Sequence, residues 1–394
     1  MSTPRVRRSR IALAGVGLAV VLASAGCTSA GTASEPSSPD RNRAIADAMN
    51  AAVKAGFPGI QVVITRPDGQ RTLTAGVGDI ATGAPIADDS RVRIGSNTKT
   101  FVSAVVLQLV AEGEIELDAP VERYLPGVVQ GNGNDGNRIS VRQLLQHTSG
   151  LPDYLASGDP SRTPDPNSPQ LKVDTEAMRT KHFEAADLVR IAMSMPPQFT
   201  PGAKAVYTNT NYVLLGMLIE RMTGRPAADE ITSRIIDRLG LHDTYYPASG
   251  ESVIRGAHPE GYHVIDGKRV DFTDLDPSWG GTAGAMISTG ADLNRFFTAL
   301  LKGDLLPAAQ LAQMKQTVPF DRMPGAGYGL GLVRQSSPCG KEVWGHGGSI
   351  PGFETRNGVA TGGAAVTVTV NQLPTDEATS AAVTKVLDTA LCEG

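Results

Sequence analysis

Cysteine and histidine are scarce in this sequence, and basic residues are not in excess. The 394 residues include three cysteines and six histidines. These residues and the acidic residues show no spacing typical of metal ligands, and the H-E-x-x-H pattern does not occur, so neither a metal nor another cofactor is expected. The formal net charge of −4 predicts no basic surface for nucleic acid. Beyond the N-terminal segment, no apolar run is long enough to cross a bilayer.

The composition is that of a globular protein with many turns. Hydrophobic residues make up 41% of the chain and charged residues 19%, which is enough apolar material for one large domain or two smaller ones. The 44 glycines and 26 prolines indicate loops rather than long helical repeats. No internal repeat of fixed period is present.

The N-terminal segment 1–26 is typical of a secretory signal. Four arginines precede the apolar run "IALAGVGLAVVLASAGC", which ends in small residues. Cys27 follows Ala25 and Gly26, as in a bacterial lipobox, although Ser24 occupies the position of the usual leucine. We therefore expect export and lipidation of Cys27, which would anchor the chain to the outer face of the cell membrane. The alternative is plain secretion, with Cys27 removed or left as a free thiol.

The two other cysteines lie near the end of the chain, at Cys339 and Cys392. An exported chain meets an oxidising compartment, so a disulfide between them is expected, tying the last helix to a strand. The alternative is a pair of buried thiols.

The order of predicted elements indicates an α+β domain. A flexible tether, 27–39, is followed by the folded domain, 40–394, which opens with a helix over 40–55. The segment "IQVVITRPDGQRTLTAGVG" predicts an antiparallel hairpin, and "GLGLV", "KEVWGHG", "TRNGVAT" and "AAVTVTVNQ" predict strands near the C-terminus. Helices are predicted between these regions and at 376–391. The terminal strands are therefore expected to share one antiparallel sheet, beside a mainly helical middle region with exposed loops at 131–137 and 157–169.

Ser96 and Lys99 form an S-x-x-K pattern where an amphipathic helix begins. Residues three apart lie on one face of a helix, so the lysine can reach the serine hydroxyl. A serine needs a base to become a nucleophile, and a lysine acts as one when burial or nearby charge lowers its pKa. The pattern alone is weak, because Ser96 is also a good helix cap and a chance match is expected in a chain of this length.

Two further patterns follow along the chain. Tyr207 and Asn209 form Y-x-N before a buried helix, where a phenol can move a proton and an amide can bind a carbonyl or orient the lysine. His346 ends a strand and precedes two glycines, and the N–H of Ser349 can serve as an oxyanion donor. None of the other five histidines has such a setting. Taken singly, these residues fit packing or capping roles equally well.

In this order, S-x-x-K, Y-x-N and H-x-G resemble the penicillin-recognising serine hydrolases, which comprise D-Ala-D-Ala carboxypeptidases, class C β-lactamases and related esterases. The segments "LLQHTSGLPDY", "PGAKAVYTNTNYVLLGMLIERMTG", "TAGAMISTGADLNRFFTALLKGDLL" and "GYGLGL" extend the resemblance over about 40–392. The whole is most similar to the secreted actinomycete D-Ala-D-Ala carboxypeptidases. The resemblance implies a β-lactamase/transpeptidase-like fold and an acyl-enzyme mechanism without a cofactor.

The resemblance also implies a role for each matching residue. Ser96 would be the acylated nucleophile and Lys99 its base. Tyr207 would move a proton, Asn209 would bind the substrate amide, and His346 would assist proton transfer or act near the substrate carboxylate. The backbone N–H groups of Ser96 and Ser349 would form the oxyanion hole. Trp279 matches an aromatic wall of the pocket, or is a plain core residue.

Two departures weaken the prediction of a substrate. Gly347 replaces the hydroxyl residue that carboxypeptidases carry in the H-x-G motif. Val333 occupies the position expected for a carboxylate-binding arginine, and Arg334, next to it, is expected to point to the other face of the strand. A D-alanyl-D-alanine carboxypeptidase acting on peptidoglycan peptides is the leading interpretation. An esterase, a β-lactamase or a non-catalytic binding lipoprotein are the alternatives, and a monomer with a small peptide, ester or β-lactam ligand is expected. An α/β-hydrolase is disfavoured because the G-x-S-x-G elbow is absent.

Overall fold

The structure is a computed structural model that describes residues 38–156, 168–320, 322–323 and 325–393. The predicted signal segment, Cys27, most of the tether and most of the loop 157–169 lie outside the described residues. No helix in the described part of the chain is long and apolar enough to span a membrane.

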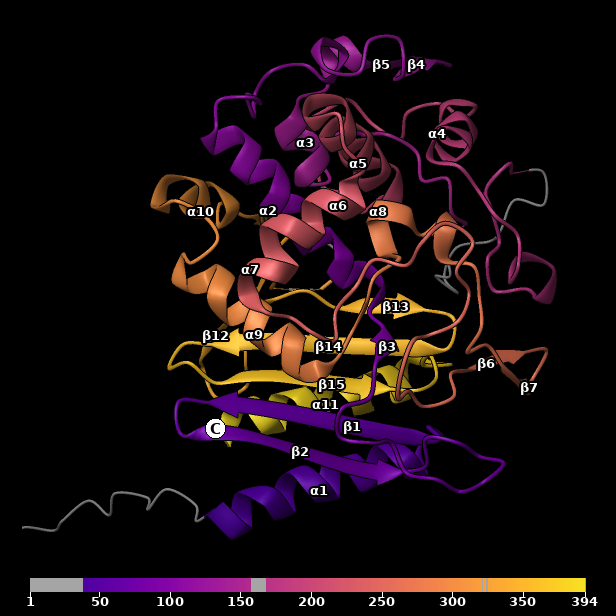
Figure 1. The fold of residues 1–394 in the computed structure, drawn as a ribbon, viewed down its shortest axis with the longest axis vertical. Coiled ribbons are helices and arrows are strands. Elements are labelled where there is room, and N and C mark those ends of the chain that lie inside the picture. Colours follow the sequence, from indigo (N-terminus) through magenta and orange to yellow (C-terminus); the bar gives the residue numbers. More distant parts are fainter. Residues whose placement is uncertain (1–37, 157–167, 321, 324, 394) are drawn as a thin grey trace, which may run out of the picture. The chain divides into compact units, whose positions relative to one another are not determined.

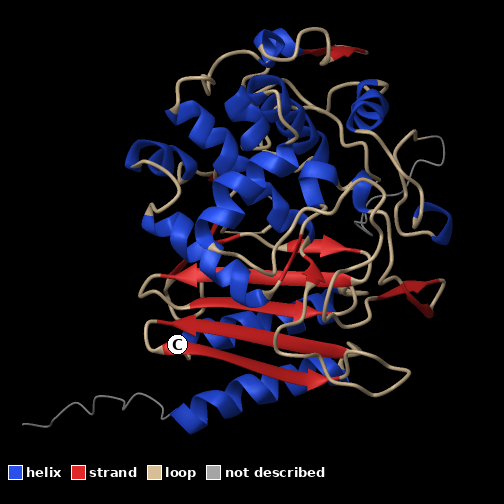
Figure 2. Ribbon diagram, viewed as in Figure 1, coloured by secondary structure: helices blue, strands red, loops and turns tan. Residues whose placement is uncertain are grey.

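One mixed-order antiparallel sheet organises the domain (Figures 1 and 2). The strand order is β2-β1-β15-β14-β12-β11-β10-β9, and β13 pairs with β14 beside β12. The first strand of the sheet therefore pairs with the last, as the sequence predicts. The strands are β1 Gly59–Arg66, β2 Gly69–Gly76, β9 Val318–Pro319, β10 Gly327–Tyr328, β11 Val333–Ser336, β12 Glu342–Gly345, β13 Gly348–Ile350, β14 Phe353–Ala360 and β15 Ala365–Val370.

Helices cover both faces of this sheet. The long helices α1 and α11 pack on one face, and α9 packs on the other, next to the helical region that contains α2 and α5. The helices are α1 Ser38–Lys54, α2 Thr98–Ala111, α3 Val141–Leu145, α4 Ala185–Met193, α5 Asn209–Thr223, α6 Ala227–Ile231, α7 Asp237–Leu239, α8 Gly281–Gly284, α9 Gly290–Lys302, α10 Ala308–Met314 and α11 Glu377–Cys392.

Short elements connect these layers. Three two-stranded sheets pair β3 with β8, β4 with β5, and β6 with β7, and the last two of these are hairpins. These strands are β3 Val92–Arg93, β8 Ile287–Ser288, β4 Gln130–Gly131, β5 Asn134–Asp135, β6 Tyr262–Ile265 and β7 Lys268–Asp271. The short helical turns are η1 Gly95–Asn97, η2 Val121–Arg123, η3 Gly136–Arg138, η4 Glu176–Met178, η5 Thr232–Ile236 and η6 Pro277–Trp279.

Strand β15 shows how sequence alternation assigns the two faces. Val366, Val368 and Val370 lie in an apolar cluster with residues of α1 and α11. The Oγ1 of Thr367, between them, donates to Asn294 Oδ1 of α9 at 2.8 Å. Because successive side chains of a strand point to opposite faces, the valines and threonines separate an apolar face from a polar one.

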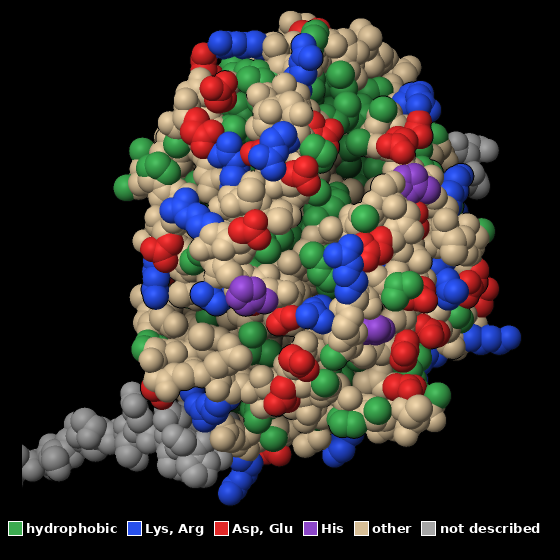
Figure 3. Space-filling view, in the orientation of Figure 1, with side chains coloured by type: hydrophobic (Ala, Val, Ile, Leu, Met, Phe, Trp, Pro, Cys, Tyr) green, Lys and Arg blue, Asp and Glu red, His purple; other side chains and the backbone are tan. Residues whose placement is uncertain are grey.

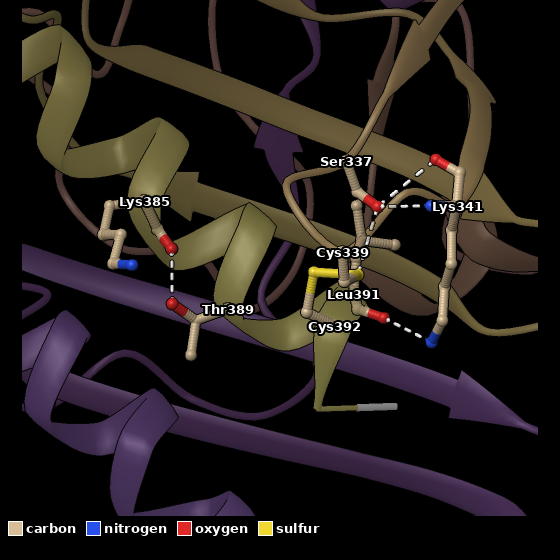
Figure 4. The surroundings of a disulfide bond; sticks show 7 residues. All are labelled: Ser337, Cys339, Lys341, Lys385, Thr389, Leu391 and Cys392. Carbon is tan, nitrogen blue, oxygen red and sulfur yellow. Dashed lines mark hydrogen bonds between the residues drawn. A yellow bond between two sulfur atoms is a disulfide. The ribbon is translucent and has the colours of Figure 1, made fainter.

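The disulfide joins the end of α11 to the turn between β11 and β12 (Figure 4). Cys339 in this turn is bonded to Cys392, the last residue of α11. Lys341 Nζ also donates to the Leu391 carbonyl at 3.0 Å, so a hydrogen bond supports the same junction. On the face drawn in Figure 3, basic and acidic side chains are interspersed.

Three local predictions need correction. The segment 329–333, predicted as a strand, is mostly a turn between β10 and β11, because Gly331 adopts a left-handed conformation with φ of 76°. Residues 131–137 form part of the β4–β5 hairpin and η3 rather than an open loop. Helix α1 begins at Ser38, inside the predicted tether, with Pro39 in a first turn that tolerates proline.

Candidate active site

Ser96 lies in the short turn η1, directly before α2. The preceding residue, Gly95, has φ of +49°, and a Cβ placed on it would lie 2.9 Å from the Ser349 nitrogen. Glycine is therefore required here because the backbone of the nucleophile turn packs directly against strand β13. This contact brings residue 96 next to a strand about 250 positions away in the sequence.

Asn97 holds this turn against the sheet from inside. Its side chain is completely buried, and Nδ2 donates to Thr355 Oγ1 at 2.6 Å and to the Ile94 carbonyl at 2.8 Å. Asn97 Oδ1 accepts a hydrogen bond from Asn357 Nδ2. Asn357 Oδ1 in turn accepts from the backbone N–H of His346. The network therefore fixes the position of Ser96 relative to the strands that follow β11.

Lys99 is completely buried in the first turn of α2 and contacts Ser96, the expected nucleophile. Its Nζ lies 3.1 Å from Ser96 Oγ, 2.8 Å from Asn209 Oδ1 and 2.7 Å from the Ala283 carbonyl. Burial lowers the pKa of this amine well below its usual range, against an opposing effect of Asp153. A neutral amine has two N–H bonds for the two carbonyl-type acceptors, which leaves its lone pair directed at the Ser96 hydroxyl.

Asn209, the first residue of α5, is held in one orientation by Asp153. Asn209 Nδ2 donates to Asp153 Oδ2 at 3.0 Å, so its Oδ1 faces Lys99. The Asp153 carboxylate also accepts from the backbone N–H groups of Asn209 and Leu155. Burial raises the pKa of Asp153. In this geometry Asn209 orients the lysine, one of the two functions expected for an amide at this position.

The Tyr207 ring stands between the lysine and the pocket opening. Lys99 Nζ lies 4.7 Å from its ring centre, and the exposed Arg322 guanidinium lies 4.6 Å from it on the pocket wall. The phenol oxygen is buried, and its polar neighbour is the Ser96 hydroxyl. Burial raises the pKa of this phenol, and the Ser96 hydroxyl acts in the opposite direction. The phenol is therefore a protonated group available to a ligand.

His346 follows β12 and is buried beside Tyr207, with ring centres 6.3 Å apart. A second histidine, His147, contacts the same tyrosine, although it lacks the strand end and the two glycines that singled out His346 in the sequence. The His147 ring is buried at 4.2 Å from the Tyr207 ring centre, and Tyr328 lies between the two imidazoles. Burial lowers the pKa of His346 to about 3 and that of His147 well below its usual value.

The backbone of Ser349 faces the nucleophile turn. Ser349 pairs with Glu354 across a hairpin whose Ile350 and Phe353 flank a two-residue turn. Hydrogen-bonded and non-hydrogen-bonded pairs alternate in such a ladder, so the Ser349 N–H points away from β14. The hydroxyl of Ser349 instead donates to Glu354 Oε2 at 2.6 Å. Only the backbone N–H of this residue is therefore placed for an oxyanion.

A pocket of about 510 Å³ connects these groups. Its walls include Ser96, Tyr207, His346 and Trp279, with Leu155 and Ile350 on an apolar side. Val333 also lines the pocket. Arg334, next along the strand, points away and lies 3.9 Å from Glu342 in an exposed ion pair. The arrangement matches the strand alternation expected for these two residues.

The structure brings together every predicted pocket residue, whereas Cys339 and Cys392 lie at the separate disulfide. The sequence did not single out His147, Asp153, Tyr328 or Arg322. His147 and Asp153 both lie in "LLQHTSGLPDY". Polar residues inside this otherwise buried segment are the sequence feature that could have identified them as site residues. In the described part of the chain, no group of three or more His, Cys, Asp or Glu residues is arranged to hold a metal ion.

Comparison with known proteins agrees with this geometry. The family model described as Beta-lactamase matches residues 42–391. A D-stereospecific amidohydrolase from Streptomyces sp. is 40% identical with a TM-score of 0.78, and the alignment covers 88% of this chain and 98% of that one. A D-amino acid amidase from Ochrobactrum anthropi SV3 is 28% identical with a TM-score of 0.74, over 89% of this chain and 98% of that one.

Similar curated proteins have several activities in their names. Penicillin-binding protein 4* of Bacillus subtilis is 28% identical over 71% of this chain, and Esterase EstB of Burkholderia gladioli is 34% identical over 43%. The alignments span 60% and 41% of the lengths of these two relatives. This chain thus shares its fold and its serine hydrolase family with these relatives, whose names indicate different substrates.

Proposed function

We propose that this chain, which belongs to the Beta-lactamase family of serine hydrolases, cleaves an amide bond on the carbonyl side of a D-amino acid residue. The natural substrate in this proposal is the D-alanyl-D-alanine end of a peptidoglycan peptide, which makes the protein a carboxypeptidase-type peptidase. The observation that carries the proposal is the buried Lys99 amine, with two acceptors for its N–H groups and its third position directed at Ser96 Oγ.

Acylation follows from these positions. Lys99 takes the proton of the Ser96 hydroxyl as Oγ attacks the carbonyl carbon. The N–H groups of Ser96 and Ser349 stabilise the oxyanion. The C–N bond then breaks, and the leaving nitrogen takes a proton from the Tyr207 phenol, which the Lys99 ammonium replaces. Water then attacks the acyl carbonyl carbon while Lys99 takes its proton, and the bond to Ser96 Oγ breaks as that oxygen takes the proton from Lys99, which releases the acid and restores both residues.

Two features support an amide of a D residue over an ester or a lactam. The relatives named as a D-stereospecific amidohydrolase and a D-amino acid amidase align over most of this chain and nearly all of their own. The exposed guanidinium of Arg322 lines the pocket, and among the described residues no carboxylate pairs with it. It can therefore receive the free carboxylate of a leaving D-alanine.

The test compares matched substrates on the purified mature protein. We expect a D-alanyl-D-alanine peptide and D-phenylalanine amide to be hydrolysed at least tenfold faster than their L counterparts, with all turnover lost in Ser96→Ala. Equal turnover of both enantiomers would refute D-specificity. Intact-protein mass spectrometry after exposure to a penicillin adds the acyl-enzyme test. A stable adduct on wild type alone supports a slowly deacylating peptidase, whereas rapid drug loss without an adduct indicates a β-lactamase.

We also propose that the protein is exported and anchored through a lipid on Cys27. The support is the signal-like segment 1–26 and the Cys339–Cys392 disulfide, since disulfides persist in oxidising compartments. Metabolic labelling with a fatty acid should mark wild type and not Cys27→Ser. Equal labelling of both proteins would contradict the anchor.

A further inference from the structure

A chain of hydrogen bonds runs through the buried wall of the site, from the loop of Tyr207 to strand β13. It links the Thr208 N–H, the His147 imidazole, the Tyr328 hydroxyl, the His346 imidazole and the Gly347 carbonyl. All three side chains are buried, with Tyr328 fully enclosed. None of the three takes part in the acylation steps described above.

The direction of this chain is set at its first member. The backbone N–H of Thr208 lies 3.3 Å from His147 Nδ1, and a backbone N–H can only donate. The side-chain amide of Asn211 also donates to this nitrogen at 3.3 Å, since its oxygen accepts from Ser149. Nδ1 of His147 is therefore unprotonated, and the proton of the neutral ring is on Nε2.

The positions of the remaining protons along the chain follow from the protonation of His147. His147 Nε2–H donates to Tyr328 Oη at 3.2 Å, so the single hydroxyl proton of Tyr328 is free to donate to His346 Nε2 at 3.0 Å. His346 Nε2 is then an acceptor, and its proton is on Nδ1, which donates to the Gly347 carbonyl at 2.6 Å. The chain cannot reverse, because its first donor is a backbone amide.

We infer that His147 and Tyr328 are positioning residues that hold His346 in one neutral tautomer and thereby fix strand β13 relative to the loop of Tyr207. His346 then presents a lone pair to Tyr328 rather than a proton to the substrate. Its function is to anchor the Gly347 carbonyl, two residues before the Ser349 N–H that faces the nucleophile turn. The proton donor to the leaving group is Tyr207.

Two other observations fit this role. His147 has φ of 59°, a left-handed conformation that is rare for a residue with a side chain and is found at functional sites. Its carbonyl also accepts from the Val206 N–H at 2.9 Å. His147 therefore holds the Tyr207 loop through its ring nitrogen, its backbone carbonyl and its ring contact with Tyr207. Through Tyr328 it also contacts the opposite wall of the site.

The first experiment reads the tautomers directly, independently of activity. In protein with 15N-labelled histidine at neutral pH, we expect His346 to be protonated on Nδ1 alone and His147 on Nε2 alone. His346→Asn and His147→Asn assign the signals. Tyr328→Phe should abolish the single tautomer of His346. Tyr154→Phe, which removes an equally buried hydroxyl that donates to the Trp279 carbonyl outside the chain, should leave it unchanged. A wild-type His346 protonated on Nε2 would overturn the inference.

A matched pair of variants separates the hydrogen bonds from simple packing. His147→Gln places an N–H donor where Nε2 was, whereas His147→Asn keeps an acceptor near Nδ1 and loses the donor to Tyr328. Asparagine tolerates the left-handed backbone better, so a packing role favours Asn. The inference requires that Gln retains the His346 tautomer better than Asn. The reverse order would overturn it.

The kinetic part rests on the proposed serine hydrolase function. With p-nitrophenyl acetate as the probe, we expect Tyr328→Phe to lower kcat roughly 10- to 100-fold, the size of effect that misplacing a catalytic group produces, with little change in KM. A changed tautomer with unchanged kcat would overturn the positioning role. If wild type hydrolyses no ester or amide, the proposed function fails, and the tautomer spectrum still decides the hydrogen-bond chain.

Discussion

The two faces of the central sheet are built by opposite means. On the face covered by α1 and α11, valines of β15 pack with Ile45, Met49 and Leu391 in an apolar cluster. On the face toward the active site, buried asparagines and threonines hold the elements together, and the Asn97–Asn357 contact joins residues 260 positions apart.

The difference shows where non-directional and directional forces are used. Apolar contact is roughly proportional to buried area and tolerates small shifts, so it suits the face that only has to be closed. Hydrogen bonds between buried groups require defined distances and angles, and an unpaired member destabilises the fold. The site face therefore has one permitted arrangement, as the proposed catalysis by Ser96 and Lys99 requires.

The largest expected effect comes from removing the base on the site face. Lys99→Met keeps the length of the side chain and loses the amine, so we expect kcat/KM to fall roughly 10⁴-fold, the upper range for a general base. The thermal midpoint should rise, because a buried amine costs stability. Steady-state kinetics and calorimetry measure the two. The exposed Lys302 at the end of α9 gives the control Lys302→Met, and a comparable loss there would contradict the assignment.

The second effect breaks the apolar face. Ile60 is completely buried against α1 and α11, and Ile60→Ala should lower the free energy of unfolding by about 2–5 kcal/mol through the lost contacts and the cavity. Activity per folded molecule should stay within about twofold, because the site face is untouched. Denaturant titration tests this. The exposed Ile80, with 44% of its surface accessible, gives the matched control Ile80→Ala.

The third effect is a pH dependence that belongs to the site face. The pKa of His346 is about 3 in the folded protein and 6.5 in the unfolded reference, so between these values the unfolded chain binds more protons. Stability therefore falls as pH decreases from 6.5 toward 3, by about 1.4 kcal/mol per pH unit for this residue. Denaturation of His346→Asn between pH 4.5 and 6.5 should show a shallower slope than wild type. Equal slopes would contradict a buried neutral imidazole.

The smallest effect tests the strand next to the site. Arg334 and Glu342 are both about half exposed, so Arg334→Ala should change stability by no more than about 0.5 kcal/mol. The value of kcat/KM should change less than twofold, because Arg334 points away from the pocket that Val333 lines. A tenfold loss of activity would mean that this strand presents its other face to substrate.

Much of the fold can be predicted from local pattern. The Val–Thr alternation of β15 and the hairpin around Pro67 and Asp68 identify strands of the sheet, and the order of the three motifs predicts the residues that line the site. His147, Asp153 and Arg322 could not be identified in this way. Their functions come from hydrogen bonds and ring contacts with segments 56 to more than 170 positions away, and nothing in the local sequence encodes such contacts.

The position of β15 between β1 and β14 has a consequence for the timing of synthesis. Ser96 is made before the strand that carries the Ser349 N–H and before the strand that completes the sheet. A nascent chain that stops before residue 365 has a serine and a lysine without the framework that aligns them. The framework that aligns Ser96 and Lys99 therefore assembles only after the strands over 348–370 have been made, and it depends on contacts of high sequence separation, which form slowly.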